Sequence, residues 1–336
     1  MELDDLHLIS NGFIKAKVVL AAAELGLFEI TAGEGVTAEE AAERLDGEPR
    51  GTEILLDALV AIEILDKRDD RYRLRAELEP LLREDAPSQT VAMLRHRNRM
   101  FRDWSRLEDR IRGLGPAPGS DRELLHDPRA NRDFIRAMLS ASGELAPSVV
   151  DRIDLAGVRR VADLGGGPGH YAAELARRGE AIEVWLIDLP LTLETACGLE
   201  SLGPKHDRVH AVPWDFYEEP QPADLPSFDL VFLSQVMHAE SPERNRALLR
   251  TIVQLLGSGG RLVIHEFFID PDRTSPAEAA LFAVNMLAMT PGGRTYTVQE
   301  VAEWARDAGL ESIGFEQVGE RSGLATFRRV RPNYRG

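Results

Sequence analysis

The sequence predicts an α/β fold in which a mostly parallel sheet ends in an antiparallel hairpin, preceded by a helical region. From about residue 151 onward, short apolar runs alternate with helical patterns, which is typical of a parallel sheet. The first run leads into four glycines between positions 165 and 169, and a helical pattern follows at once. The last two runs are joined only by the turn 319–323, so we expect them to pair as a hairpin at the sheet edge. The expected strands span residues 158–164, 183–188, 208–212, 228–234, 261–267, 312–318 and 323–330.

The composition argues against several classes of protein. A chain of 336 residues suggests two domains, or one large domain with an appendage. The formal net charge of −16 argues against a nucleic acid as the main ligand. Cys197 is the only cysteine, so no intramolecular disulfide can form and we expect a cytoplasmic protein. The first residues lack the basic region of a signal peptide, and no apolar run approaches 18 residues, so we expect no membrane span.

The first helix is expected to need a partner. Residues 4–25 predict one long helix with a broad apolar face, and Gly26 follows in the position of a C-cap. That partner is either the chain's own next helices or the same helix of a second subunit. We therefore expect an N-terminal dimerisation arm.

Two shorter helices and a hairpin follow this arm. Thr37 opens a capping box for a helix that continues to Leu45, residues 51–65 predict a second amphipathic helix, and residues 67–74 predict a tight hairpin. This order resembles a winged helix, which suggests DNA binding. However, residues 37–66 carry nine Asp or Glu against two Arg, so this region would repel phosphates. We expect a structural role.

Residues 91–112 predict an Arg-rich helix between the two regions. One of its faces carries Arg95, Arg99, Arg102 and Arg106. This face is either a solvated basic stripe behind a core stripe, or it supplies an arginine to a carboxylate on the substrate. A loop is expected at 113–120, and a further helical stretch begins at Phe134. The expected domains are a helical dimerisation domain at 1–90, a helical linker at 91–150 and a ligand-binding domain at 151–336.

The glycine turn is the expected ligand site. Glycines let a ligand lie against the backbone, and the start of the following helix offers free N–H groups. Asp188 ends the next apolar run about 20 positions on, where an acidic residue commonly holds ribose hydroxyls. Residues 167–172 match a loose dinucleotide pattern, but glycines at alternate positions after Asp163 match a loop for S-adenosylmethionine (SAM) better. A turn without a ligand and an NAD-dependent dehydrogenase are the alternatives, and the terminal hairpin is not typical of a dehydrogenase.

With the glycine turn, Asp188 and the closing hairpin, the chain resembles the class I SAM-dependent methyltransferases. Over nearly its whole length it is similar to the O-methyltransferase family that includes plant caffeic-acid and flavonoid enzymes, acetylserotonin methyltransferase and bacterial antibiotic-tailoring enzymes. The resemblance implies a Rossmann-like sheet, a winged-helix-like N-terminal domain and a homodimer formed through the N-terminal helices. It also implies SAM as the cofactor and a small hydroxylated aromatic as the methyl acceptor.

The same resemblance assigns the cofactor-binding residues. Asp188, with Leu189 after it, would hold the ribose. Asp215 and Phe216 would lie against the adenine, although Trp214 precedes them where the family often has Gly. Ser234 stands where plant members place a Lys near the adenine, and it is included in this site. The methionine part of SAM would be surrounded by Asp163, Gly165, Gly167 and Gly169.

The resemblance also implies a catalytic base. In the family this is a His shortly after the fourth strand, and His238 fills that position. Glu266, at the end of the fifth strand, fills the position of the Glu that orients this His. The chain departs from the family pattern at Ala239, where an Asp is usual, and at Thr295, where a second flanking Glu is usual. His265 should point to the opposite face of its strand and have a structural role.

The acceptor pocket is implied to have Met and aromatic walls, which suit a flat aromatic molecule. Ordinary core packing is the alternative for each apolar position, and Asn285 would add a polar contact. The residues assigned to this pocket are Trp104, Phe134, Met138, Asn285, Met286 and Thr290.

Methyl transfer to a phenol needs a base. A phenol has a pKa near ~10 and an imidazole near ~6.5, so a neutral His238 can accept the phenolic proton as the oxygen attacks. A carboxylate behind the imidazole fixes its tautomer. The alternative for His238 is a helix N-terminal residue without a catalytic role.

The sequence therefore predicts a cytoplasmic, homodimeric, SAM-dependent O-methyltransferase acting on an aromatic secondary metabolite. One alternative keeps the SAM site but uses non-methylating or C- or N-methylating chemistry. Another is a ligand-sensing regulator that uses the winged helix. No cysteine cluster or His/Asp spacing of metal-ligand type is present, so we expect no metal.

Overall fold

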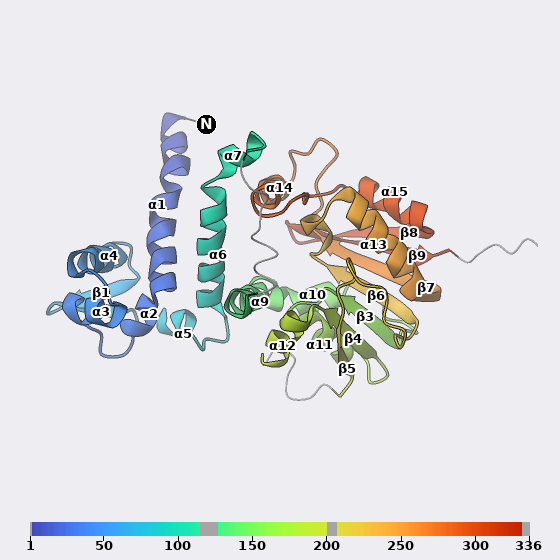
Figure 1. The fold of residues 1–336 in the computed structure, drawn as a ribbon, viewed down its shortest axis with the longest axis horizontal. Coiled ribbons are helices and arrows are strands. Elements are labelled where there is room, and N and C mark those ends of the chain that lie inside the picture. The colour runs from blue at the N-terminus through green and yellow to red at the C-terminus, as the bar shows by residue number, and fades with distance from the viewer. Residues whose placement is uncertain (1, 115–126, 200–206, 331–336) are drawn as a thin grey trace, which may run out of the picture. The chain divides into compact units, whose positions relative to one another are not determined.

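The computed structural model describes residues 2–114, 127–199 and 207–330 (Figure 1). Contacts among them group into two compact units. The first unit extends to Arg102 and includes Leu139–Ala141, and the second contains the described residues from Asp103 to Met138 and from Ser142 onward. Most of the loop expected at 113–120 lies outside the described residues.

The first unit is helical, with one small hairpin. Its elements are α1 (Leu3–Leu25), α2 (Leu27–Ile30), α3 (Ala38–Leu45), α4 (Pro49–Ala61), β1 (Leu65–Arg68), β2 (Arg71–Leu74), α5 (Glu79–Leu82) and most of α6 (Thr90–Trp104). The capping box at Thr37 is confirmed, since its side chain and that of Glu40 each accept a bond from the other's main-chain N–H. The helix expected over 51–65 ends at Ala61, because Glu63 adopts a left-handed conformation with φ 63°.

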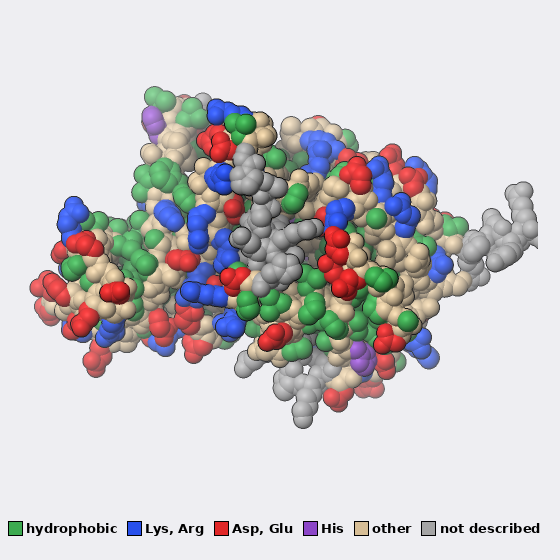
Figure 2. Space-filling view, in the orientation of Figure 1, with side chains coloured by type: hydrophobic (Ala, Val, Ile, Leu, Met, Phe, Trp, Pro, Cys, Tyr) green, Lys and Arg blue, Asp and Glu red, His purple; other side chains and the backbone are tan. Residues whose placement is uncertain are grey.

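The β1–β2 hairpin turns on two residues. Asp69 and Asp70 both have positive φ, 49° and 60°, which is the geometry of a two-residue type I′ turn. The expected hairpin at 67–74 is therefore confirmed, with strands that start two residues earlier. Acidic side chains predominate over α3 and α4 in Figure 2, in keeping with the structural role expected for these helices.

Helix α1 is buried only near its C-terminal end, at Leu20, Ala22 and Ala23, and Gly26 caps it with φ 72°. Farther toward its N-terminus, hydrophobic side chains reach the surface along the helix (Figure 2). These exposed side chains are Leu3, Leu6, Leu8, Ile9, Phe13 and Ile14. By length and composition alone, α1 is the one helix among the described residues that is long and apolar enough to cross a membrane. A helix that packs on another protein surface passes the same test.

Helix α6 lies alongside α1 in the first unit (Figure 1). Lys17 donates to the Asn98 side chain over 2.6 Å, and Asn98 in turn donates to Glu24 over 3.0 Å. Arg95, from the basic stripe, donates to Glu84 over 2.9 Å. Arg95 therefore forms an ion pair within the first unit, which favours a structural role for this arginine over contact with a substrate carboxylate.

The second unit is built on a seven-stranded sheet in the order β5-β4-β3-β6-β7-β9-β8. The first five strands in this order are parallel, and β9 is antiparallel to both β7 and β8, so the parallel sheet and the closing hairpin are confirmed. Strand β7 starts at Leu256, earlier than the expected 261, because the segment before Arg261 already pairs irregularly with β6. The strands are β3 (Arg160–Leu164), β4 (Glu183–Asp188), β5 (Val209–Pro213), β6 (Phe228–Ser234), β7 (Leu256–Glu266), β8 (Leu310–Val318) and β9 (Ser322–Arg329).

Helices pack on both faces of this sheet (Figure 1). One apolar core joins the sheet to α13 (Pro242–Leu255) and α15 (Val298–Ala308), and another joins it to α10 (Ala146–Val150) and α11 (His170–Arg177). The helix expected over 91–112 is interrupted after Trp104 and resumes as α7. The remaining elements are α7 (Leu107–Ile111), α9 (Pro128–Ser142), η1 (Gly143–Leu145), α10 (Ala146–Val150), α11 (His170–Arg177), α12 (Pro190–Cys197), η3 (Met237–Ala239), α13 (Pro242–Leu255), α14 (Ala277–Met289) and α15 (Val298–Ala308). Because β3, β4, β5 and β6 are parallel neighbours, the loops that follow them meet at one edge of the sheet.

Candidate active site

The glycine turn follows β3 directly. Gly165 has φ 73°, and its N–H donates to the Ile187 carbonyl of β4 over 2.8 Å. A Cβ on Gly165 would lie 2.6 Å from Cγ2 of Val236, so this position accepts only glycine without displacement. Gly167 and Gly169 also have positive φ, and Gly169 precedes the first residue of α11. The turn therefore presents bare backbone beside the segment that follows β6.

Asp188 connects the end of β4 to this turn. Its Oδ2 accepts the Gly167 N–H over 2.9 Å, and its Oδ1 accepts the Leu189 N–H over 2.7 Å. Burial raises the pKa of Asp188, although these two N–H groups act in the opposite direction. Each carboxylate oxygen keeps a second lone pair, so the side chain can still accept from ribose hydroxyls.

Asp163 is the most unusual polar group of the turn. The residue is fully buried, and neither carboxylate oxygen has a hydrogen-bond partner. Burial, with a smaller contribution from the negative Asp188, raises the pKa of Asp163 to about 7, although the nearby Ala172 N–H acts in the opposite direction. A buried carboxylate without a partner is costly unless a cationic ligand approaches it.

The pair that follows β5, Asp215 and Phe216, also lies near the turn. Asp215 accepts the main-chain N–H groups of Tyr217 and Glu218 through Oδ1. A Cβ on Gly165 would lie 3.5 Å from the Phe216 ring, so this aromatic side chain borders the turn. Trp214 is buried in the core and leaves the turn open.

Two further predicted residues lie at the same edge of the sheet. Leu189 is the N-cap of α12. Ser234, at the end of β6, is bonded to Nδ1 of His265 over 3.0 Å, and the other ring nitrogen of His265 is bonded to Ser322 over 2.8 Å. His265 is thus held among β6, β7 and β9, as expected for a structural residue.

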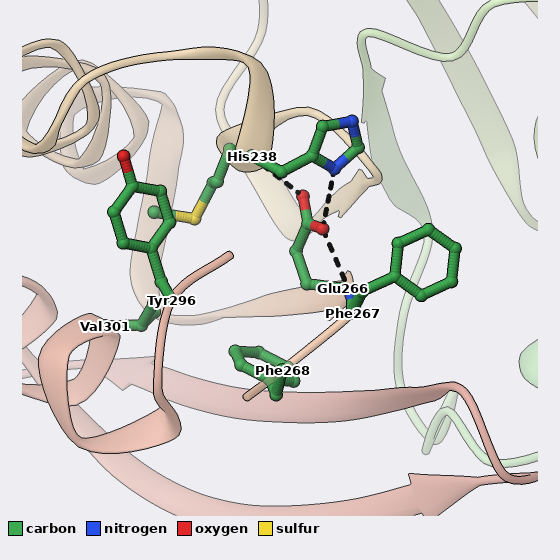
Figure 3. Close-up of a pocket in the computed structure, with 7 residues that line it drawn as sticks. His238, Glu266, Phe267, Phe268, Tyr296 and Val301 are labelled. Atoms are coloured by element: carbon green, nitrogen blue, oxygen red, sulfur yellow. Dashed lines mark hydrogen bonds and ion pairs between the residues drawn. The ribbon is translucent and has the colours of Figure 1, made fainter. Parts of the chain in front are cut away.

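His238 and Glu266 form a close pair (Figure 3). His238 lies on η3, after β6, and Glu266 ends β7. Their Nδ1 and Oε2 atoms are 2.9 Å apart, and the His238 N–H reaches Oε1 over 3.4 Å. Burial alone would raise the pKa of Glu266, but contact with His238 lowers it, so the carboxylate is charged. Because Nδ1 faces an acceptor-only carboxylate, it carries the imidazole proton and Nε2 carries the free lone pair.

Two aromatic residues beside His238 were not predicted. The Phe282 ring meets the imidazole edge-on with centroids 4.8 Å apart, and the Phe267 ring stacks at 6.4 Å. Phe282 lies on α14 one turn before Met286, and Phe267 follows Glu266, so both positions adjoin predicted site residues. A cavity of about 10 Å³ behind the pair is lined by His238, Glu266 and neighbours that include Tyr296 (Figure 3).

The predicted acceptor residues are only partly brought together. Trp104 Nε1 donates to Asn285 Oδ1 over 2.8 Å, which joins the end of α6 to α14. Met286 is buried on the same helix. Thr290 is the C-cap of α14, and its hydroxyl is used within the chain: it donates to the Met286 carbonyl and accepts from the Gly293 N–H.

The other two predicted pocket residues lie on α9. Phe134 and Met138 are half-buried and one turn apart. Thr295, at the position of the missing second Glu, is almost fully buried, and its hydroxyl has no hydrogen-bond partner. Among the described residues, no three His, Cys, Asp or Glu side chains are grouped in a way that could hold a metal ion.

Two protein families match the chain. Residues 119–311 match an O-methyltransferase domain, and residues 7–77 match an O-methyltransferase dimerisation domain. The chain belongs to the O-methyltransferase family. The second match covers most of α1 and the helices and hairpin that follow it, as far as β2.

Two curated relatives and one solved structure similar to this chain are methyltransferases. The 3-hydroxy-5-methyl-1-naphthoate 3-O-methyltransferase of Streptomyces sahachiroi is 32% identical over 309 residues, which cover 91% of this chain and 88% of the relative. The tetracenomycin polyketide synthesis 8-O-methyl transferase TcmO of Streptomyces glaucescens is 30% identical, with 97% of each chain covered. Human N-acetylserotonin methyltransferase, solved in complex with SAM, superposes with a TM-score of 0.80 at 25% identity, covering 98% of this chain and 99% of that chain.

The enzyme is therefore a SAM-dependent O-methyltransferase. The described residues fit this cofactor, because the unpaired, buried Asp163 carboxylate suits a ligand with an ammonium and a sulfonium. At Gly167 a Cβ would meet nothing within 4 Å, so the turn leaves room there for the methionine part.

Proposed function

We propose that this O-methyltransferase methylates a hydroxyl group of an aromatic secondary metabolite, with His238 as the base and Glu266 as its orienting group. The observation that carries the proposal is the His238–Glu266 pair at 2.9 Å. His238 lies two residues after Val236, whose side chain borders the glycine turn. The segment that follows β6 therefore contains both the proposed base and a residue that borders the proposed cofactor site.

The residues have separable roles in the reaction. When bound, SAM supplies a methyl group that its sulfonium has already activated. His238 Nε2 would take the proton from the acceptor hydroxyl, so that the oxygen can accept the methyl group that SAM supplies. Glu266 stabilises the imidazolium that results and holds Nδ1–H in place. Phe267 and Phe282 shield the imidazole from water and provide flat surfaces for an aromatic ring.

The cofactor site is proposed around the glycine turn. Asp188 would hold the ribose and Phe216 would contact the adenine, with Asp215, Leu189 and Ser234 beside them. Support comes from their common position at the ends of β4, β5 and β6. The methionine part would lie against Asp163, Gly165, Gly167 and Gly169, where the glycines have no side chain to block close approach.

We also propose a cytoplasmic homodimer formed through the N-terminal helices. The exposed apolar side chains of α1 and the matched dimerisation domain support this assembly. Sedimentation at the 37.3 kDa of one chain, over micromolar concentrations, would contradict it.

A direct test of the function is release of S-adenosylhomocysteine from SAM over a panel of phenols and hydroxynaphthoates. We expect acceptor-dependent release and a product heavier by one methyl group on oxygen, because the pair can deprotonate a hydroxyl. Methylation on carbon or nitrogen would contradict the O-methyl assignment. Tight SAM binding without release across the panel and a cell extract would favour a non-methylating activity.

The Asn285 amide indicates the kind of acceptor. Indole N–H only donates, so the Asn285 atom facing Trp104 is oxygen and the NH₂ group faces elsewhere. No bond from this NH₂ group is found among the described residues. Asn285 lies one turn after Phe282, which contacts His238. We infer that the acceptor carries a second oxygen, such as a carboxylate or carbonyl, that accepts from Asn285.

A matched pair of acceptors tests this contact. 3-Hydroxy-1-naphthoate and 2-naphthol share the fused ring and the hydroxyl, but only the first has a carboxylate. Asn285→Leu is expected to raise KM for the naphthoate by about 10-fold or more, from the loss of a hydrogen bond to a charged group. KM for 2-naphthol should change little. Leu287→Gln, at an exposed position of α14, is the control, and equal losses for both acceptors would refute the contact.

A further inference from the structure

His238 lies on a very short element. The η3 helix consists only of Met237, His238 and Ala239, and one turn of 3₁₀ helix does not hold its own conformation. The direction of the imidazole therefore depends on bonds from outside the turn. Glu266 supplies one through the His238 N–H and Nδ1.

Asn245, on the first turns of α13, supplies bonds on both sides of His238. The residue is fully buried. Its Nδ2 donates to the Met237 carbonyl over 2.8 Å and to the Glu240 carbonyl over 3.3 Å. These carbonyls belong to the residue before His238 and the residue two after it. Asn245 Oδ1 accepts from the Tyr217 hydroxyl over 3.4 Å, so donors and acceptor are both used.

Two other contacts hold the same turn. The Tyr296 hydroxyl also donates to the Glu240 carbonyl. Gly293 packs so closely that a Cβ there would overlap the His238 carbonyl oxygen. The backbone around the imidazole is thus fixed by Asn245 and Tyr296 on one side and by Gly293 on the other.

We propose that Asn245 is a positioning residue for methyl transfer, which holds the His238 turn so that Nε2 points at the acceptor hydroxyl. This rests on the proposed role of His238 as the base. Without the Asn245 amide, the Met237 and Glu240 carbonyls each lose one of their donors, and the turn relaxes. A displacement of the base by about 1 Å is enough to cost on the order of 100-fold in rate.

The test compares Asn245→Ala with Arg250→Ala, an exposed position of the same helix. We expect Asn245→Ala to lower kcat by about 10- to 100-fold. SAM affinity, measured by calorimetry, and KM for the acceptor should stay within about twofold, because no ligand contact is removed. A wild-type kcat in a folded Asn245→Ala variant would overturn the proposal.

A double-mutant cycle with His238→Ala separates positioning from general structural damage. If Asn245 acts through His238, adding Asn245→Ala to His238→Ala should lower the residual kcat by less than about twofold. If the loss of kcat in the double variant equals the product of the losses in the two single variants, the proposal is overturned. If His238→Ala alone keeps full activity, the proposed base fails, and this result is distinct from a failure of Asn245.

Tyr296→Phe provides a second variant should Asn245→Ala not fold. It keeps the ring and removes only the hydroxyl that bonds to the Glu240 carbonyl. A loss in kcat of several-fold, again absent in the His238→Ala background, is expected. An unchanged kcat for a folded Tyr296→Phe together with an unfolded Asn245→Ala would assign Asn245 to stability alone and overturn the proposal.

Discussion

His238→Ala is expected to lower kcat by about 10²- to 10⁴-fold, the usual contribution of a positioned general base. The physical reason is that Nε2 of His238 carries the lone pair that accepts the proton, because the other ring nitrogen is hydrogen-bonded to Glu266. SAM affinity should stay within about twofold of the wild-type value, because His238 is not part of the glycine turn. Only Val236, two residues before it, contacts that turn. Acceptor-dependent release of S-adenosylhomocysteine, with calorimetry for SAM, measures both quantities.

Glu266→Gln and a surface histidine sharpen this experiment. Gln keeps the shape of Glu266 but removes its charge, so it should lower kcat less than His238→Ala does. His210→Gln, on β5, is the control because its side chain is 41% exposed. Release that survives His238→Ala unchanged would leave the methyltransferase intact and remove His238 as its base.

Asp163→Asn is expected to stabilise the ligand-free enzyme at pH 8 and to weaken SAM binding by about 10- to 100-fold, the range for a lost bond to a charged group. The folded-state pKa of about 7 lies above the unfolded value of 3.8, so the folded protein binds more protons between these pH values. Stability from this group is therefore present at low pH and lost as pH rises through 7. The cost at pH 8 is on the order of a few kcal/mol, which Asn avoids, so Tm should rise by roughly 2–6 °C.

The same ionisation predicts a pH dependence of cofactor binding. SAM carries positive charge and should bind more tightly as pH rises through about 7, where Asp163 ionises. The Asn variant should lose this dependence. Asp224→Asn, at an exposed position, is the control. A variant that binds SAM as tightly as the wild type at every pH would show that Asp163 does not meet the cofactor's charge.

Local sequence signals predicted most of the fold. Glycines at 165–169 mark a turn that needs positive φ, and the Thr37 capping box and the Gly26 cap are set by neighbouring residues. Element ends were less well predicted, because they depend on partners far along the chain. The start of β7 at Leu256 follows from pairing with Phe228, which no local pattern records.

The candidate site shows the same division. His238 and Glu266 were indicated by resemblance to a family pattern, and the structure brings them to 2.9 Å. Phe282 and Asn245 were missed because their roles come from contacts with η3 that helical spacing alone does not reveal. Phe282 had one usable signal, since it lies one helical turn before Met286.

The position of β9 has a consequence for synthesis of the protein. This strand inserts between β7 and β8, and its Gly323 pairs with Glu266. A chain leaving the ribosome therefore presents β7 with an unpaired edge until residues 322–329 have emerged. The strand that ends in Glu266 is completed by residues 322–329, which are made after it, so a nascent chain cannot assemble this part of the sheet until they have emerged. Chains stalled before Ser322 would expose this edge to other strands and be prone to aggregate.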